Sequence, residues 1–409
     1  MKQYVIVGGG VAAVGCIEGI RTIDKESKII MITNEGCPVY CRPLISYYLQ
    51  GKTNFEKMKY RPDDFYTENN CELVYGNVVK IDNTDNSVLL DNGSSISYEA
   101  LCIATGSSPF VPPFSGLDTV KDKYSFMTEN DTLMLEQAIN ENSRVLIVGA
   151  GLIGLKCAEG LCERVKSITV CDLAPRVLSS ILDDTCASIM QKKLEEQGIS
   201  FMLGNSAERF EQNTAFMKNG EEVPFDVLVL AVGVRPNISL IQEIGGETDR
   251  GILIDQAMQT SLEHIYAAGD CTQGFDASTG EKRILAILPN AYMQGKCAGI
   301  NMAGGKEIFD KAIPMNAIGF FGLHALTAGR YTGEMYEEKS DGSIKRLFVE
   351  DNLLVGFMLI GDIDRAGIYT SLVRDKTPLD TLDFELLKQA PSLIPFSAEY
   401  RGKKLGGAV

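Results

Sequence analysis

Residues 145–154 read Val-Leu-Ile-Val-Gly-Ala-Gly-Leu-Ile-Gly, a run of four aliphatic residues followed by three spaced glycines. The aliphatic run predicts a buried strand, and the glycines predict a tight turn into a helix. In this pattern Gly149 permits the turn, Gly151 lets the backbone approach a pyrophosphate, and Gly154 lets the helix pack closely on the strand. The start of such a helix also offers free N–H groups to an anion. The stretch therefore predicts a dinucleotide cradle.

A second strand, Ser167 to Cys171, leads into Asp172, at the spacing where a carboxylate meets the ribose hydroxyls of adenosine. A carboxylate accepts hydrogen bonds from two hydroxyls and repels a 2′-phosphate, so Asp172 favours NADH over NADPH. Arg176, four residues on, softens this prediction because a guanidinium can bind phosphate. The alternative interpretation of Asp172 is a solvated strand end.

The N-terminus carries the same pattern. Residues 4–13 read Tyr-Val-Ile-Val-Gly-Gly-Gly-Val-Ala-Ala, with Gly8, Gly10 and Ala13 in the three key positions. The third position tolerates alanine. The next predicted strand, Lys28 to Thr33, leads to Glu35, which is the candidate ribose acceptor of this first site.

The similarity between the two halves extends beyond the glycines. Short alternating runs at 77–81, 87–90 and 95–97 predict a small β-meander before a buried strand at 100–104, and comparable runs follow in the second half. Gly149 follows Gly8 by 141 residues, and Gly233 follows Gly106 by 127. We therefore infer two related nucleotide-binding units. The alternative is that any two doubly wound halves share such turns.

Composition sets limits on the partners and on the compartment. The length of 409 residues predicts two or three domains, and a formal net charge of −15 argues against nucleic acid as a partner. Eleven cysteines without a signal peptide suggest a reducing cytoplasm, and no window is apolar enough to span a bilayer. The spacings of Cys37 with Cys41 and of Cys157 with Cys162 match no zinc or iron–sulfur ligand set, so no metal site is expected.

Two proline-containing stretches, 108–113 and 236–237, look like linkers at the ends of the second unit. A predicted strand, 264–270, ends in Asp270, and residues 290–303 predict a helix with small residues on one face. Beyond Pro314 we expect strands at 320–322, 346–350 and 353–361 and a helix at 366–374, with a weakly patterned tail from 391. This mixture of predicted strands and a helix indicates a third, α+β domain.

Five motifs, in order, resemble the pyridine nucleotide-disulfide oxidoreductase superfamily: residues 8–13, Ala104-Thr105-Gly106, residues 149–154 with Asp172, residues 232–237, and Ala268-Gly269-Asp270. Residues 39–48 and the C-terminal texture look most like the branch of NADH:rubredoxin reductases and the flavin module of nitrite reductase. The resemblance implies two Rossmann-like domains and a small C-terminal domain. The expected boundaries are 1–112 with 238–313 for FAD, 113–237 for the nicotinamide nucleotide, and 314–409.

The resemblance also implies a set of cofactor-binding positions. Arg42, before Pro43, would lie on a rigid turn aimed at the flavin or its phosphates, Asp270 would bind the ribityl chain, and a helix beginning near Asn290 would face the flavin pyrimidine. The expected FAD residues are Gly8, Gly10, Ala13, Glu35, Arg42, Val79, Ala104, Thr105, Gly106, Asp270 and Asn290. The expected NAD residues are Gly149, Gly151, Leu152, Ile153, Gly154, Asp172 and Gly233. A surface loop is the alternative for Arg42, and a core helix is the alternative for residues 290–303.

Relatives place a glutamate two residues after the last glycine, paired with a lysine beside the flavin. Here these positions hold Lys156 and Tyr47, and we expect both side chains to contact the flavin. An uncompensated lysine there would raise the flavin potential. The alternative is a lysine on the outer surface of the helix.

The resemblance implies an FAD-dependent enzyme that passes electrons from NADH to a rubredoxin- or ferredoxin-like iron–sulfur protein. A CoA-disulfide or peroxide reductase using Cys41 is an alternative, although Cys41 is displaced from the expected thiol position near Pro43. A flavin-carrying subunit of a larger redox complex is another. Because such acceptors are usually acidic, a docking face needs clustered basic residues, and Arg401, Lys403 and Lys404 are candidates. A solvated terminus is the alternative for this tail.

Overall fold

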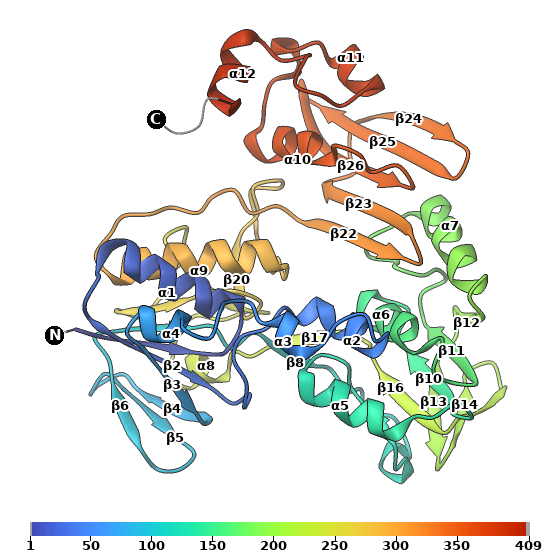
Figure 1. Cartoon of the computed structure of the whole chain (residues 1–409), viewed down its shortest axis with the longest axis horizontal. Helices are drawn as coiled ribbons and strands as arrows, with labels where there is room; N and C mark the ends of the chain where they lie inside the picture. The colour runs from blue at the N-terminus through green and yellow to red at the C-terminus, as the bar shows by residue number, and fades with distance from the viewer. Residues whose placement is uncertain (1, 406–409) are drawn as a thin grey trace. The chain divides into compact units, whose positions relative to one another are not determined.

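Each glycine motif follows the central strand of a parallel five-stranded sheet in the computed structural model (Figure 1). The structure describes the backbone of residues 2–405 and the side chains of residues 2–402. The first sheet has the order β19 (Ile265–Ala267), β7 (Ala100–Ile103), β1 (Gln3–Val7), β2 (Lys28–Thr33) and β3 (Cys71–Tyr75). The second has the order β12 (Ile199–Leu203), β11 (Ser167–Asp172), β10 (Arg144–Val148), β16 (Val227–Leu230) and β9 (Lys123–Tyr124).

The two sheets repeat one topology. The order β7-β1-β2-β3 in the first corresponds to β16-β10-β11-β12 in the second. Each half also carries a three-stranded antiparallel meander. The first meander is β4 (Val78–Asp82), β5 (Ser87–Leu90) and β6 (Ser95–Ser97), and the second is β13 (Ala207–Glu211), β14 (Thr214–Met217) and β15 (Glu222–Pro224). The central strands are almost fully buried, as expected for sheets covered on both faces. The predicted pair of Rossmann-like units is confirmed.

Helices precede, connect and follow these strands. The helices are α1 (Val11–Ile23), α2 (Ile45–Leu49), α3 (Phe55–Met58), α4 (Phe65–Glu68), α5 (Glu129–Ala138), α6 (Leu152–Leu161), α7 (Asp184–Glu195), α8 (Ser239–Glu243), α9 (Leu288–Met302), α10 (Ala366–Asp375), α11 (Phe384–Gln389) and α12 (Ala398–Leu405), with 3₁₀ turns η1 (Arg42–Leu44), η2 (Leu117–Thr119) and η3 (Leu379–Thr381). A small sheet of β18 (Ile252–Leu253), β20 (Thr272–Phe275) and β21 (Lys282–Arg283) lies in the chain between α8 and α9.

Helices α1 and α9 pack backbone against backbone, side by side in Figure 1. Two glycines four residues apart on each helix form the contact: Gly15, Gly19, Gly295 and Gly299. A Cβ atom at any of them would lie closer than 3.0 Å to a backbone atom of the other helix, which real side chains do not tolerate. The small-residue face predicted for residues 290–303 therefore has a packing role, because it holds α9 against the helix that begins at the first glycine motif.

The two predicted linkers pair with each other. β8 (Ser107–Pro109) and β17 (Val234–Pro236) form an antiparallel ribbon where the chain enters and leaves the second sheet. Below the ribbon, the Asn237 side chain donates to the Thr105 carbonyl (2.8 Å), and the Thr105 hydroxyl donates to the Asn237 carbonyl (2.9 Å). The linkers are thus an ordered junction.

The chain divides into two compact units, and the first holds both parallel sheets. The second unit consists of residues 181–193, 276–281 and 310–409. Its sheet is antiparallel, in the order β22 (Met315–Phe320), β23 (Leu323–Gly329), β26 (Leu353–Ile360), β25 (Ser343–Glu350) and β24 (Glu334–Ser340), and α10 packs on it. Helix α7 belongs to this unit, although it lies in the chain between β11 and β12. The expected three-domain boundaries stay a prediction.

Several predictions for the second unit need correction. Residues 320–322 are the end of β22 and a turn, because Phe321 and Gly322 both have positive φ. Strands β23 and β24 and helix α7 were not predicted, and the tail forms α12, although residues 406–409 lie outside the described residues.

We expect Gly299→Ala to destabilise the protein by about 1–3 kcal/mol, the usual cost of overpacking a tight contact. The matched control is Gly367→Ala in α10, where nothing lies within 4 Å of the added methyl. The control should be neutral or slightly stabilising because alanine favours helix. Thermal unfolding of both variants checks this. Equal melting temperatures would contradict the backbone contact.

Candidate functional site

The first glycine of each motif holds its loop against the neighbouring strand. Gly8 and Gly149 have φ of +127° and +118°, a region that side chains rarely adopt. A Cβ atom would clash with the backbone of Ala104 at the first site and of Ala231 at the second. At the second site, a Cβ atom on Gly154 would lie 2.0 Å from the Gly149 carbonyl oxygen, so only glycine fits there. Ala13 occupies the corresponding position at the first site and is fully buried.

The second glycine of each motif faces open space. No atom lies within 4 Å of the Cβ position of Gly10 or Gly151. Both residues are N-caps, of α1 and α6, and neither helix receives a side-chain cap, so the first-turn N–H groups are available to an anion. Leu152 and Ile153 are the first residues of α6. The residues present therefore fit two dinucleotide pyrophosphates.

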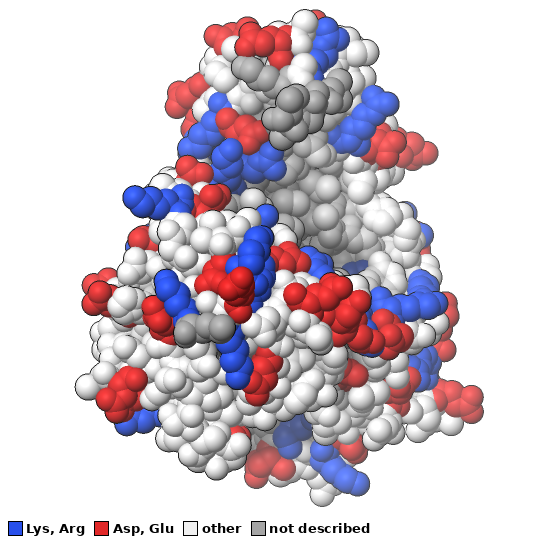
Figure 2. Space-filling model, turned by 60° about the vertical axis from the view of Figure 1, so that its left-hand side comes forward, with Lys and Arg blue, Asp and Glu red and all other residues white. Residues whose placement is uncertain are grey.

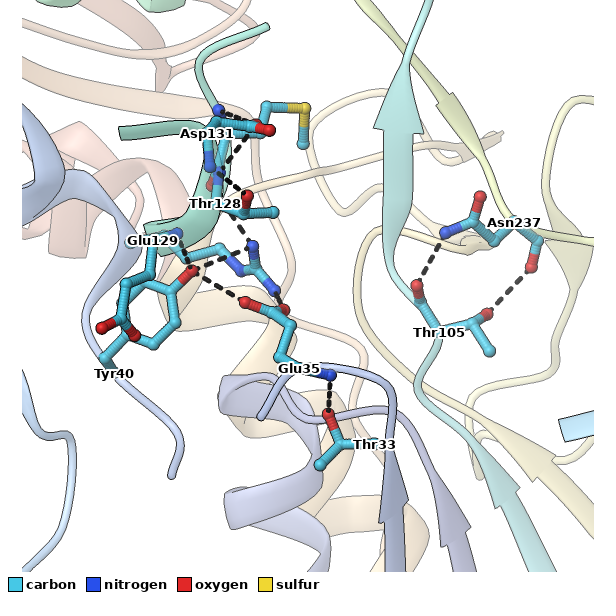
Figure 3. A network of polar contacts seen from close by, with 10 residues as sticks. Thr33, Glu35, Tyr40, Thr105, Thr128, Glu129, Asp131 and Asn237 are labelled. Carbon is cyan, nitrogen blue, oxygen red and sulfur yellow. Dashed lines mark hydrogen bonds and ion pairs between the residues drawn. The ribbon is translucent and has the colours of Figure 1, made fainter. Parts of the chain in front are cut away.

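The side chains of Glu35 and Tyr40 meet in Figure 3, and Arg42 bonds to both of them. The Arg42 guanidinium bonds to one Glu35 oxygen, and the Tyr40 hydroxyl donates to the other (2.8 Å). Burial lowers the pKa of Arg42, but the Glu35 carboxylate outweighs it and the net pKa is raised. The network continues to α5, since Tyr40 accepts the Glu129 N–H (2.8 Å) and Arg42 donates to the Met127 carbonyl (3.2 Å). Two expected FAD residues are thus in direct contact.

Asp270 lies in a loop fixed by α9. The preceding Gly269 donates its N–H to the Gln294 side chain (2.9 Å), and its Cβ position lies close to the side chains of Ala12 and Ala291. This places Asp270 next to the starts of both α1 and α9. Burial raises the pKa of Asp270, and the Arg42 guanidinium partly offsets this. Asn290, the third residue of α9, is buried.

The remaining expected flavin positions are spread along the first unit. Ala104 is buried at the end of β7, and Thr105 and Gly106 form the junction with Asn237. Val79 lies in β4 with its side chain 44% exposed. No described contact brings Val79 to the other expected residues.

Asp172 ends β11 beside the second glycine loop. Its two carboxylate oxygens accept the backbone N–H groups of Ala150 (2.7 Å) and Ala174 (2.8 Å). These bonds fix the carboxylate next to Gly151 and leave lone pairs for further donors. Arg176 donates to the Ser179 carbonyl (3.2 Å). Gly233, exposed and with φ of +112°, lies in the turn before β17.

The structure brings Lys156 and Tyr47 together. The Lys156 ammonium lies 5.4 Å from the centre of the Tyr47 ring and 2.6 Å from a carboxylate oxygen of Glu159, which is buried. Lys156 therefore has a carboxylate partner, and the expectation of an uncompensated charge is wrong. The side chain is only 18% exposed, so it does not lie on the outer surface of the helix.

All eleven cysteines are free thiols. Burial raises the pKa of Cys41, and burial together with Glu129 raises that of Cys37 to about 12. Cys157 is completely buried, and burial also raises the pKa of Cys162. Burial therefore disfavours the thiolate, which is the reactive form of cysteine.

Four residues of the site were not predicted: Tyr40, Glu159, Asn237 and Gln294. Asn237 and Gln294 contact residues that are 132 and 25 positions away in sequence. Tyr40 and Glu159 contact residues nearby in sequence, through side-chain directions that depend on the local fold. Tyr40 and Asn237 lie in stretches that carry the family resemblance, residues 39–48 and 232–237. For Gln294, the only indication was its place in the helix predicted at 290–303.

Two Rossmann-like units, each with an uncapped glycine-rich helix start and an acidic residue after the next strand, define a reductase of the two-dinucleotide type. Residues 2–295 match the family "Pyridine nucleotide-disulphide oxidoreductase". The chain belongs to this family, as predicted, and its class is a flavoprotein oxidoreductase that uses a nicotinamide nucleotide.

Curated relatives agree with this assignment, and a solved structure shares the fold. The chain is 33% identical over 395 residues to the epsilon subunit of NADH-dependent phenylglyoxylate dehydrogenase from Aromatoleum evansii, covering 93% of each. It is 31% identical to nitrite reductase [NAD(P)H] of Bacillus subtilis, covering 92% of this chain and only 48% of the relative. It is 31% identical to rubredoxin–NAD(+) reductase of Alcanivorax borkumensis, covering 67% and 73%. A ferredoxin reductase structure from Rhodopseudomonas palustris has a similar fold, with a TM-score of 0.86, 24% identity and coverage of 96% and 100%.

Among the described residues, none of the helices combines the length and the apolar character that a membrane crossing requires. The cytoplasmic location stays a prediction.

We expect Gly151→Ala to fold normally, because its backbone is extended and its Cβ position is open, yet to bind NADH more weakly because the methyl occupies the space meant for pyrophosphate. Gly149→Ala, in contrast, should lower the melting temperature, because it meets the Ala231 backbone at positive φ. Thermal unfolding and the NADH concentration for half-maximal flavin reduction distinguish the two. A Gly151→Ala variant with normal NADH affinity would contradict the cradle.

Proposed function

We propose that this protein is an FAD-dependent NADH oxidoreductase that passes electrons to a small iron–sulfur protein of the rubredoxin or ferredoxin type. The observation that carries the proposal is the combination of two open dinucleotide cradles with thiols whose pKa burial raises. A raised pKa disfavours the reactive thiolate, so the proposal sends the electrons from NADH to a separate acceptor. A flavin accepts hydride from a nicotinamide and can release the electrons singly.

The chain supplies binding and positioning for this reaction. The starts of α1 and α6 offer N–H groups to the two proposed pyrophosphates, and the paired Arg42 and Glu35 are proposed to meet the FAD phosphate and ribose. Asp270, held by the α9 loop, would bind the ribityl chain. Lys156, Glu159 and Tyr47 are proposed to line the flavin with an ion pair that carries no net charge.

Asp172 is proposed to select NADH. Two backbone N–H groups fix its carboxylate beside Gly151, so ribose hydroxyls can donate to it while a 2′-phosphate is repelled. Arg176 donates to the Ser179 carbonyl within its own loop.

An iron–sulfur acceptor is supported by the relative named rubredoxin–NAD(+) reductase. Such acceptors usually carry negative charge, so a docking face needs basic residues. Acidic and basic side chains are interspersed on the face shown in Figure 2, which offers no large surface of one sign. Arg401 lies in α12, whereas the side chains of residues 403 and 404 lie outside the described residues, so the tail as a docking segment stays a prediction.

A second candidate function is that of a flavin-carrying subunit in a larger dehydrogenase. The observation that favours it is the phenylglyoxylate dehydrogenase relative, itself named a subunit, which matches this chain over 93% of both lengths. Purification from the native source distinguishes the candidates: a stable complex with dehydrogenase subunits supports the second, and an isolated chain that reduces a rubredoxin supports the first.

Anaerobic titration with NADH tests the proposed function. We expect full reduction with two electrons per FAD and no long-wavelength charge-transfer band, because the proposed reaction uses no thiol. The double variant Cys37→Ser, Cys41→Ser should behave identically in NADH titration and in reduction of a rubredoxin. Uptake of four electrons, or loss of turnover in the double variant, would instead establish thiol chemistry.

For Asp172→Asn, we expect the KM for NADH to rise about 10- to 100-fold, because losing a charge-assisted pair of hydrogen bonds costs about 1.5–3 kcal/mol. The KM for NADPH should fall relative to that for NADH, since the repulsion is gone. Steady-state kinetics with both nucleotides and a dye acceptor measure the effect. An unchanged ratio of the two KM values would refute the role of Asp172.

A further inference from the structure

The hydroxyl of Tyr40 joins two segments of the first compact unit that lie far apart in sequence. It donates to one oxygen of Glu35 (2.8 Å) and accepts the N–H of Glu129 (2.8 Å), as Figure 3 shows. A phenol has one proton, and a backbone N–H can only donate, so this proton is left for the Glu35 carboxylate. Because Tyr40 is buried, both hydrogen bonds have a fixed direction.

The start of helix α5 holds this hydroxyl in place. Glu129 is the first residue of the helix, and its N–H is one of those that a helix leaves without an internal partner. Thr128 and Asp131 form a capping box (Figure 3). In it, the Thr128 side chain accepts the Asp131 N–H (3.0 Å), and the Asp131 carboxylate accepts the Thr128 N–H (3.1 Å). Tyr40 is therefore anchored to a helix start that its own side chains already fix.

Glu35 is tied to the first glycine loop through its backbone. Its N–H donates to the Thr33 hydroxyl (3.2 Å), and a Cβ atom on Gly9 would lie 2.3 Å from the same hydroxyl oxygen. The Arg42 guanidinium bonds to the second carboxylate oxygen, and the Glu35 side chain stays 21% exposed. Two protein donors thus orient the carboxylate beside the loop, and lone pairs remain for a ligand.

We propose that Tyr40 is a positioning residue for the adenosine ribose of FAD. Anchored by α5, its hydroxyl holds the Glu35 carboxylate in the orientation that receives the ribose hydroxyls, so FAD does not have to order it on binding. This inference rests on the proposed function, which takes Glu35 as the ribose acceptor. It implies that α5, which leads into the second sheet, contributes to FAD affinity.

Competition between FAD and an analogue tests the proposal. In the analogue, the adenosine ribose lacks both hydroxyl groups. The holoprotein is equilibrated with a known mixture, and the ratio of the two flavins that stay bound gives their relative Kd. The unmodified protein should prefer FAD, and we expect Tyr40→Phe to narrow this preference by roughly 2- to 12-fold, the effect of losing one hydrogen bond. A purely structural role would weaken both flavins equally and leave the ratio unchanged.

The matched control is Tyr48→Phe. The Tyr48 hydroxyl also donates to a carboxylate on α5, that of Glu136, over 2.8 Å. This variant should leave the ratio unchanged. Glu35→Ala should narrow the preference at least as far as Tyr40→Phe does. Because Tyr40 acts through Glu35, the double variant should narrow it no further than Glu35→Ala alone.

A second pair of variants reaches the same contact from the helix. Glu129→Pro removes the N–H that Tyr40 accepts, and proline suits the first position of a helix. Glu129→Ala keeps the N–H. Only the proline variant should narrow the preference for FAD, and this pair decides the question if Tyr40→Phe does not fold.

Three results would overturn the inference: an unchanged ratio in both Tyr40→Phe and Glu129→Pro, an equal change in Tyr48→Phe, or a double variant with a narrower preference than Glu35→Ala. Failure of the proposed function gives a different result, because the unmodified protein would then bind neither flavin.

Discussion

The contact between α1 and α9 sets the geometry of the proposed flavin site. Both helices begin there, and four glycines bring their backbones together so closely that no side chain fits between them. The Glu18 carboxylate, bonded to Arg61 (2.7 Å) and to the Tyr292 hydroxyl, clamps the pair from the side. Because the Gly269 loop lies between the helix starts, a shift of either helix would move the dinucleotide loop and Asp270 together. The first cradle is rigid for this reason.

Local signals predicted much of the fold. The two glycine motifs, the central strands and the meanders follow from short-range patterns of burial and turn residues, and strands such as β2 and β5 have the predicted bounds. Strand β24, in contrast, reads Glu-Met-Tyr-Glu-Glu-Lys-Ser at the edge of its sheet, where little burial is needed and no alternation of apolar residues results. Helix α7 is largely polar, because it buries only one narrow face.

The candidate site divides in the same way. The residues of the motifs were predictable because the glycines and acids stand at fixed spacings from a predicted strand. The pairings of these residues were not predicted. Glu35 and Arg42 were each expected near FAD, but not their ion pair, and Glu159, one turn after Lys156 on α6, was not recognised as its partner. Because Glu159 was not recognised as its partner, the charge of Lys156 was expected to be uncompensated.

The ribbon of β8 and β17 has an evolutionary and practical consequence. The chain leaves the first sheet and returns to it at adjacent, hydrogen-bonded positions, so the intervening residues form a loop whose ends already meet. A host can accept a whole second sheet at such a point without stretching its own backbone. The junction therefore marks where one ancestral unit can be inserted into its copy, and where a unit selecting a different nucleotide can be exchanged by grafting.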